Sequence, residues 1–447
     1  MNLCGEVLRM LLMALRSKRR GWNAVAIALL LTSCAAQAAK HEADAKSPES
    51  GHAAVPAPVA RIAVGQLGFL APSAAYLNLR LAWASLNFID NNHLLFTFHT
   101  NGLLQRIPDD PLDDEDQMIH ADVLEIGSGR VLRQADWRMH DRGRYLWALQ
   151  DGKFLVRERD SLFLTDNSLE LRPYLIFKTD LQGVEVSPGR GMMMLEVKKL
   201  LPPEESDSGG DAPSLFQPSL GSPVQVRQRR TEMMLLRPGE RAVLAEAEIR
   251  DPIPVPLLED GILEVIEGKQ SKQWLIEREM TNKTTEQVGE VRSGCTPQLQ
   301  ALSRNVVLAQ DCPVNGASGS MVSALSLAGE VLWEGLWQSK YIWPTFDYAE
   351  DGSRFAYESL EMNRSIGTMD AFGESDVVAQ PVGVFDTESG KLELVLNASP
   401  ILSEGQNFAL SADGRRFAIL REGAIEVYDL PPVEAKEPVA TAAKGKK

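Results

Sequence analysis

The stretch FALSADGRRFAILREGAIEVYDL, residues 408–430, decides the fold that this sequence predicts. Apolar residues alternate with small or polar ones before Asp413-Gly414, and the alternation resumes after it and again after Glu422-Gly423. Glycine adopts positive φ without steric cost, and aspartate tolerates the neighbouring turn position, so these dipeptides favour tight turns. The stretch therefore predicts three short antiparallel strands.

The same order of strand, turn and strand recurs along the chain. Residues 346–359 (FDYAEDGSRFAYES) carry the Asp-Gly turn at the matching position, and looser copies begin at residues 86, 145, 184 and 299. A second pattern, two strands around a glycine, follows most copies; its glycines are residues 129, 268, 329 and 390, and the last two intervals are 61 residues each. A repeated four-stranded unit of this size is typical of a β-propeller, whose blades stand radially around an axis.

The two ends of the repeat region complement each other. The last unit has three strands, and residues 59–69 (VARIAVGQLGF) supply a lone strand before the first full unit. In propellers such a strand often completes the last blade and removes free sheet edges. The expected fold is therefore all-β, a single β-propeller over residues 59–430 with seven blades of four antiparallel strands, closed by the N-terminal strand. The poor match of residues 198–290 to the repeat leaves six and eight blades as alternatives.

The turn Ser411-Ala412-Asp413-Gly414-Arg415 has the pattern S-x-D-G-R. In this feature the chain resembles exported bacterial β-propellers of the WD-repeat-like and YVTN kind, over residues 59–430 and most closely in the last two units. The resemblance implies a rigid ring whose loops are available for recognition.

The N-terminal residues predict export. Four basic residues between positions 16 and 20 precede an uncharged run over residues 21–39, whose strongly apolar part is shorter than the roughly 20 residues needed to span a bilayer. The tetrapeptide LTSC at residues 31–34 resembles the bacterial lipobox, which implies a signal peptide over residues 1–33 and lipidation of Cys34. Cleavage after residues 36–38 (AQA) with simple secretion, and an uncleaved anchor, are the alternatives. We expect a periplasmic or outer-envelope protein that contacts the membrane only through this lipid.

Three further segments lack the apolar residues of a core. Residues 34–58 predict a disordered tether and residues 431–447 a disordered tail. Residues 201–224, rich in Pro, Ser, Gly and acidic residues, predict a long loop within the propeller, and we expect a partner contact there because long insertions are often functional.

The net charge restricts the partners. The chain carries 46 basic and 61 acidic side chains, and removal of residues 1–33, with five basic and one acidic side chain, changes the net charge from −15 to −19. An acidic surface repels nucleic acid, so we expect no nucleic-acid partner. We expect a monomer that binds a protein, glycan or small-molecule ligand on its loop face.

Two cysteines lie in the predicted propeller, Cys295 and Cys312. The residues between them predict two strands around a turn at residues 303–305, and in a hairpin folded there position 295 pairs with position 312. In an oxidising compartment the two thiols would form a disulfide. Two unpaired thiols near strand ends are the alternative.

Candidate metal ligands are few. The predicted propeller contains His93, His99, His120 and His140, of which the first two are an even number of residues apart and so share one face of a strand. Surface or turn histidines are the expected interpretation. The acidic run DDPLDDEDQ at residues 109–117 could bind calcium through its carboxylates, but it lacks the glycine and final glutamate of an EF-hand loop, so we expect a solvated loop.

Residues 384–394 (VFDTESGKLEL) resemble the tryptophan-docking repeat of quinoprotein dehydrogenases, with Leu394 in place of the tryptophan and Trp333 at the equivalent position of the preceding unit. A quinone site would follow from that resemblance, but a hairpin turn explains the same residues. No nucleophile-elbow, P-loop or dinucleotide-binding motif is present in the sequence. We therefore assign no catalytic, cofactor-binding or metal-ligating residue and expect no cofactor.

The function expected from these features is that of a non-catalytic binding or interaction scaffold in the cell envelope. The alternative is a propeller enzyme, a lyase, hydrolase or quinone-dependent dehydrogenase, with its site in the central channel. Catalytic groups in a propeller converge from distant loops, so no local spacing reveals them.

Overall fold

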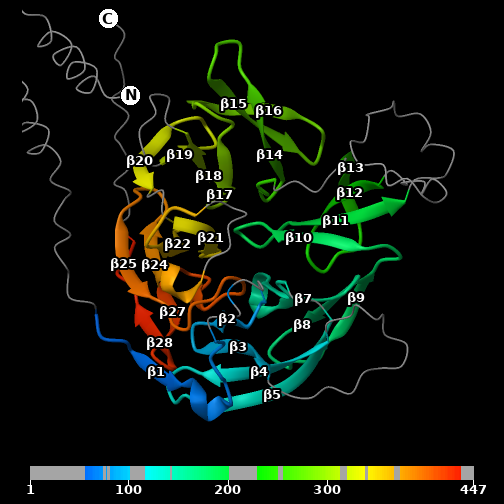
Figure 1. The fold of residues 1–447 in the computed structure, drawn as a ribbon. Helices are drawn as coiled ribbons and strands as arrows, with labels where there is room; N and C mark the ends of the chain where they lie inside the picture. The colour runs from blue at the N-terminus through cyan, green and yellow to red at the C-terminus, as the bar shows by residue number, and fades with distance from the viewer. Residues whose placement is uncertain are drawn as a thin grey trace, which may run out of the picture. The chain divides into compact units, whose positions relative to one another are not determined.

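The computed structural model describes residues 56–433 except 74–76, 78–80, 101–115, 141–142, 201–228, 250–254, 313–319, 338–340 and 367–372. Seven antiparallel sheets form a ring (Figure 1). The protein is thus an all-β seven-bladed propeller, as the sequence predicts. The described part of the chain contains no helix with the length and apolar character needed to cross a membrane.

The blades follow one another in chain order. Blade 1 contains β2 (Ala84–Asp90), β3 (His93–Thr100), β4 (Gln117–Glu125) and β5 (Val131–Met139). Blade 2 contains β6 (Leu146–Ala148), β7 (Phe154–Glu158), β8 (Ser161–Thr165) and β9 (Arg172–Ile176). Blade 3 contains β10 (Leu181–Val186), β11 (Met193–Leu200), β12 (Arg229–Leu236) and β13 (Val243–Ile249). Blade 4 contains β14 (Gly261–Glu267), β15 (Gln273–Met280) and β16 (Thr285–Arg292).

The last three blades complete the ring. Blade 5 contains β17 (Gln298–Ala301), β18 (Val306–Asp311), β19 (Ser320–Ser326) and β20 (Val331–Trp337). Blade 6 contains β21 (Tyr341–Tyr348), β22 (Arg354–Met362), β24 (Pro381–Asp386) and β25 (Leu392–Asn397), with the short β23 (Val377–Ala379) beside β22. Blade 7 contains β26 (Phe408–Leu410), β27 (Arg416–Arg421), β28 (Ala424–Asp429) and β1 (Ala60–Ala63). Three short 3₁₀ helices lie among the described residues: η1 (Val64–Leu67), η3 (Gln150–Gly152) and η4 (Glu374–Asp376).

The N-terminal strand closes the ring. β1 pairs antiparallel with β28, Ala60 lying opposite Val427, and the Val59 amide donates to the Val427 carbonyl at 2.7 Å. Blade 7 therefore takes three strands from the C-terminal part of the chain and one from the N-terminal part, which leaves the ring without an open joint. This confirms the closure predicted from residues 59–69 and 408–430.

Blade 4 deviates from the other blades. Among the described residues, which here begin again at 255, its innermost strand is represented by an isolated bridge of Leu257 with Ile262. The Leu263 amide also donates to the Pro256 carbonyl at 3.0 Å. Pro256 has no amide hydrogen and so donates no hydrogen bond at this position. Gly268 therefore lies between the second and third strand positions of its blade, whereas Gly129, Gly329 and Gly390 lie between the third and fourth. The sequence pattern placed Gly268 in the wrong turn.

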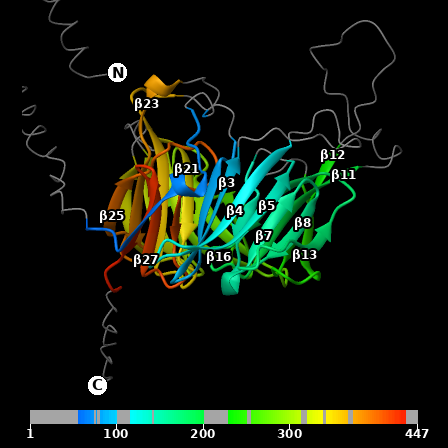
Figure 2. The same ribbon diagram turned by 90° about the horizontal axis from the view of Figure 1, so that it is seen from below.

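Apolar clusters hold neighbouring blades together. Each of the seven blade interfaces contains one cluster of buried apolar side chains, and Figure 2 shows the sheets standing side by side around the ring. Because strand side chains alternate between two faces, each blade contributes one face to the cluster before it and one to the cluster after it. The interface of blades 3 and 4 is rich in methionine, a flexible side chain that fills irregular space beside the shortened blade.

Candidate functional site

A central cavity of about 600 Å³ lies on the axis of the ring. Its wall includes residues from β2, β6, β10, β17 and β21 and from the segments before β14 and β26, so all seven blades contribute. The innermost strand of a blade pairs on one side only, so its free edge presents backbone donors and acceptors to the cavity. The volume falls within the range of roughly 300–1,000 Å³ that small-molecule sites occupy.

Arg144 brings a positive charge into the cavity from the segment before β6. Its Nε donates to the Leu146 carbonyl at 3.1 Å, and its guanidinium carbon lies 5.4 Å from the centre of the Trp147 ring. The indole face attracts the cation and, together with the backbone hydrogen bond, fixes the direction of the side chain. The outer nitrogens of the guanidinium remain available to the cavity.

Glu185, on β10, brings a negative charge. Its side chain is exposed to the cavity, which is itself surrounded by protein. The resulting desolvation raises the pKa of Glu185, and the positive charge of Arg144 lowers it. No described residue gives this carboxylate a hydrogen bond or an ion pair within 4.0 Å. The cavity thus holds an acidic group without an internal partner.

Asp347 and Tyr348 lie at the end of β21. The Leu410 amide donates to Asp347 Oδ2 at 2.7 Å, and burial raises the pKa of Asp347 although Arg190 and this hydrogen bond lower it. Gln300 Nε2 donates to the Tyr348 hydroxyl at 2.6 Å, and burial together with Glu185 and Asp347 raises the pKa of that hydroxyl. This wall of the cavity therefore presents several oxygen atoms close to one another.

One turn of blade 3, residues 187–191, reaches the axis. Gln150 Nε2 from blade 2 donates to the Gly189 carbonyl at 2.8 Å, and the Gly191 amide donates to Glu259 Oε2 from blade 4 at 3.0 Å. Arg190, held at a φ of 59°, donates to the Tyr348 carbonyl of blade 6 at 3.4 Å.

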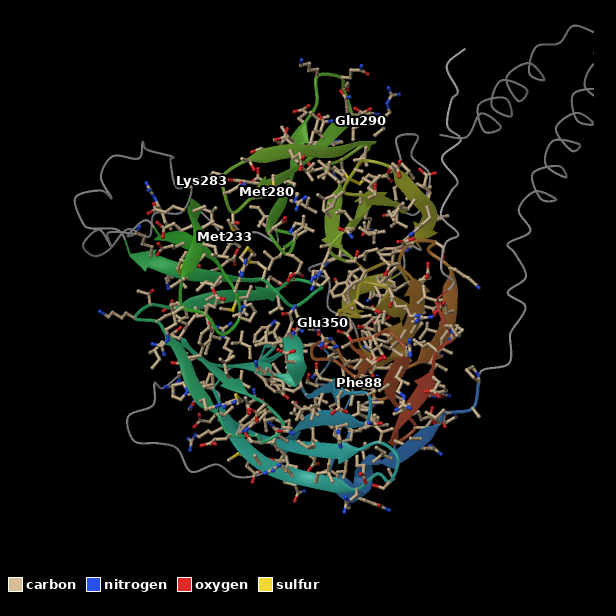
Figure 3. The ribbon with its side chains drawn as sticks, turned by 180° about the vertical axis from the view of Figure 1, so that it is seen from behind. Phe88, Met233, Met280, Lys283, Glu290 and Glu350 are labelled. Atoms are coloured by element: carbon tan, nitrogen blue, oxygen red, sulfur yellow. A yellow bond between two sulfur atoms is a disulfide. The ribbon has the colours of Figure 1, made fainter. Side chains whose placement is uncertain are left out.

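Glycine is required in this turn because its neighbours are close. A Cβ at Gly189 would lie 2.6 Å from Glu259 Oε1 and 2.7 Å from Arg304 Nε of blade 5. A turn that contacts blades 2, 4, 5 and 6 lies at the axis of the ring. Glu350 lies near the centre of the ring (Figure 3). Burial raises the pKa of Glu350, and the nearby Arg190 lowers it. The turn therefore forms part of the cavity wall.

The four predicted histidines do not converge on one site. His93 Nδ1 lies 2.9 Å from Asp90, and His99 stacks on Trp83 at a ring separation of 4.7 Å. His120 lies between Asp136 and Asp122, and His140 lies 3.2 Å from Glu158 on another blade. Among the described residues, no group of three or more His, Cys, Asp or Glu side chains is arranged to hold a metal ion.

Cys295 and Cys312 form a disulfide, with Cα atoms 5.5 Å apart. The strands of this hairpin are β17 and β18, as the sequence predicts, but Gln298 pairs with Gln310, one residue away from the symmetric register expected. Cys34, the signal peptide, the tether at residues 34–55, the acidic residues 109–115, the loop at residues 201–224 and the tail from residue 434 lie outside the described residues. Those predictions stay predictions.

The segment that resembles a quinone-enzyme repeat makes a contact between blades. Asp386 Oδ1 accepts hydrogen bonds from the Ser389 amide at 2.8 Å and hydroxyl at 2.6 Å, which closes the turn. Trp333 of blade 5 packs on Gly390 and donates from Nε1 to the Thr387 carbonyl at 3.0 Å. Trp137 of blade 1 makes the same kind of contact with the Leu169 carbonyl of blade 2 at 3.2 Å. These residues join blades and lie away from the cavity wall.

Comparison with known proteins identifies the fold alone. No protein-family model matches the chain, and no curated protein matches it. Among solved structures, an acylaminoacyl peptidase from Pyrococcus horikoshii is 11% identical over 82% of this chain and 54% of that one, with a TM-score of 0.45. An oligogalacturonate lyase in complex with manganese is 11% identical over 78% and 97% of the two chains, with a TM-score of 0.40. The WD40 domain of Toxoplasma gondii coronin is 10% identical over 86% and 89%, with a TM-score of 0.39. This chain spans about half the length of the acylaminoacyl peptidases.

Proposed function

We propose that the protein is a binding scaffold of the cell envelope, anchored by lipid at Cys34, and that it binds a small ligand in its central cavity. The observation that carries the proposal is the cavity wall. It combines about 600 Å³ of space with Arg144 and Glu185, two charged side chains that have no ion-pair partner within 4.0 Å among the described residues. Unpaired charges inside a protein cost stability, so a ligand that pairs with them gains affinity.

The ligand test uses native mass spectrometry of the full chain after incubation with a small-molecule extract of bacterial envelopes. We expect one bound mass, lost in Ser403→Trp, which places an indole in the cavity wall, and kept in Ser168→Trp, which places it on an exposed turn of blade 2. The absence of any bound mass, or its persistence in Ser403→Trp at unchanged occupancy, would contradict the proposal.

A catalytic role is the second candidate, and one observation favours it. Glu185 and Asp347 both have pKa values raised by burial, which suits carboxyl groups that transfer protons. The same mass measurement separates the two functions, because an enzyme would convert the bound compound over time and a scaffold would release it unchanged.

The anchoring part of the proposal has its own test. Detergent phase partitioning of the chain produced in bacteria should place the wild type in the detergent phase and Cys34→Ala in the aqueous phase. Cys4→Ala is the matched control, because Cys4 lies inside the predicted signal peptide. Partitioning of Cys34→Ala into detergent would argue for an uncleaved anchor.

A further inference from the structure

The charged side chains of the cavity differ in how many hydrogen bonds they already make to the protein. Arg157 donates from Nε to the Arg159 carbonyl at 3.1 Å and from Nη2 to the Leu181 carbonyl at 2.5 Å, so it ties blade 2 to blade 3. Arg144 gives only Nε to the backbone, and Glu185 gives neither oxygen to any described residue. Arg144 and Glu185 therefore hold binding capacity that the described wall leaves unused.

Arg144 is suited to a carboxylate. A guanidinium presents parallel N–H groups that match the two oxygens of a carboxylate, and such bidentate pairs are the strong ones. The Trp147 ring at 5.4 Å and the Leu146 carbonyl at 3.1 Å hold the side chain before any ligand arrives. This preorganisation reduces the entropy lost on binding.

The region around Glu185 is suited to an ammonium group. An ammonium has three donors and no acceptor, so it requires several oxygen atoms around it. Glu185 from blade 3 interacts electrostatically with the Tyr348 hydroxyl and with Arg144, and Asp347 interacts with the same hydroxyl, so these groups lie near one another in the cavity. The two carboxylates and the phenol oxygen supply the acceptors.

We propose that the cavity binds a small zwitterion, an amino acid or a short peptide, with its carboxylate on Arg144 and its ammonium group on Glu185. The inference rests on the proposed binding function and adds the class of ligand. A simple anion would place a negative charge beside Glu185, and a simple cation would place a positive charge beside Arg144. A ligand with both charges satisfies both side chains, and a cavity of about 600 Å³ has room for more than one residue.

The experiment is calorimetric titration of the full chain with trialanine, trialanine amide and N-acetyl-trialanine, and with alanine and dialanine to establish the preferred length. We expect an unblocked compound to bind, and each blocking group to weaken binding by tenfold or more. In Arg144→Gln, the free acid and the amide should bind equally. In Glu185→Gln, the free amine and the acetylated form should bind equally.

Two controls and one comparison complete the design. Arg172→Gln and Glu422→Gln remove exposed charges outside the cavity and should leave all affinities unchanged. Equal binding of blocked and free peptides by the wild type, or unchanged selectivity in Arg144→Gln and Glu185→Gln, overturns the zwitterion proposal. If none of these compounds binds while the envelope ligand is still lost in Ser403→Trp, the ligand class is wrong and the binding function stands. If no ligand of either kind depends on residue 403, the binding function itself fails.

Discussion

Replacing Arg354 with methionine removes a buried cation that joins blades 6 and 7. The Arg354 side chain is fully buried, and it pairs with Glu393 of β25, whose side chain is 7% exposed, through Nε to Oε2 at 2.5 Å and Nη2 to Oε1 at 3.2 Å. Its Nη1 also donates to the Gly414 carbonyl at 2.8 Å, in the turn of the stretch that decides the fold, and its Nη2 donates to the Pro431 carbonyl. Methionine matches the volume and leaves all of these partners unsatisfied.

The expected cost follows from the partner that remains. Removing one member of a buried ion pair typically costs about 3–5 kcal/mol, because the other charge stays buried without compensation. Replacing both members with apolar residues of similar volume is often neutral, so Arg354→Met with Glu393→Leu should recover much of the loss. An exposed pair is worth about 0–1 kcal/mol, so Arg172→Met, which breaks the pair with Asp166 on the surface of blade 2, should change little.

Urea denaturation followed by tryptophan fluorescence measures the difference. With a slope of about 3 kcal/mol per molar urea, a loss of about 4 kcal/mol moves the midpoint by roughly 1.3 M. The double variant should recover at least half of that shift. A loss below about 1 kcal/mol for Arg354→Met, or a double variant less stable than either single variant, would refute the argument that the buried Arg354 side chain, paired with Glu393, stabilises the contact of blades 6 and 7.

Three further predictions concern the ring. Burial raises the pKa of Glu358 to about 8 from an ordinary 4.5, so the folded state keeps a proton that the unfolded state releases. The free energy of unfolding should therefore fall by on the order of 4 kcal/mol as the pH rises from about 4.5 to 8. Urea titrations at several pH values measure this dependence, and Glu358→Gln should remove it. Gly390→Ala should lower the melting temperature more than Gly423→Ala, because both have positive φ but only the first Cβ would collide with an indole, at 2.4 Å; equal losses in calorimetry would contradict this. Replacing Cys295 and Cys312 together with serine should cost about 3 kcal/mol by the same urea assay, and a variant as stable as the wild type would disprove a contribution from the disulfide.

The hairpins of the ring could be predicted because two local signals agree in them. All six predicted copies of the first pattern are the first two strands of their blades, where alternation with period two flanks a turn of residues such as Gly, Asp or Asn. β26 and β27 around Asp413-Gly414 are the clearest example. Closure could also be predicted, because a blade with three strands requires a fourth from elsewhere in the chain.

Blade 4 could not be predicted because the part of its first strand that the structure describes is a single bridge. Pro256 lacks an amide donor, and in the described residues from 255 onwards the inner strand is represented by the bridge at Leu257. The pattern around Gly268 then resembles the turn between third and fourth strands, although it joins the second and third. Local periodicity indicates that two strands are adjacent, but it does not number them within a sheet.

The cavity residues escaped sequence reasoning for a different reason. Arg144, Glu185 and Asp347 come from blades 2, 3 and 6, and each is an ordinary polar residue at or near the start or end of an inner strand. Arg144 and Glu185 are 41 positions apart in the sequence, and Glu185 and Asp347 are 162 positions apart. These separations do not indicate that the three residues lie in one cavity, because only the closure of the ring brings them together.

One sequence feature near the cavity does carry a signal that could have been recognised. Residues 187–191 read SPGRG, and the residue with positive φ in this turn is Arg190 and not either glycine. The two glycines are required by Glu259, whose carboxylate oxygens lie 2.6 and 2.4 Å from where a Cβ at Gly189 or Gly191 would stand. Two glycines around Arg190 are thus explained by a turn that approaches four other blades, and not by the hairpin itself. The segments before β6 and β26 carry Arg144 and Ser403 into the same cavity wall.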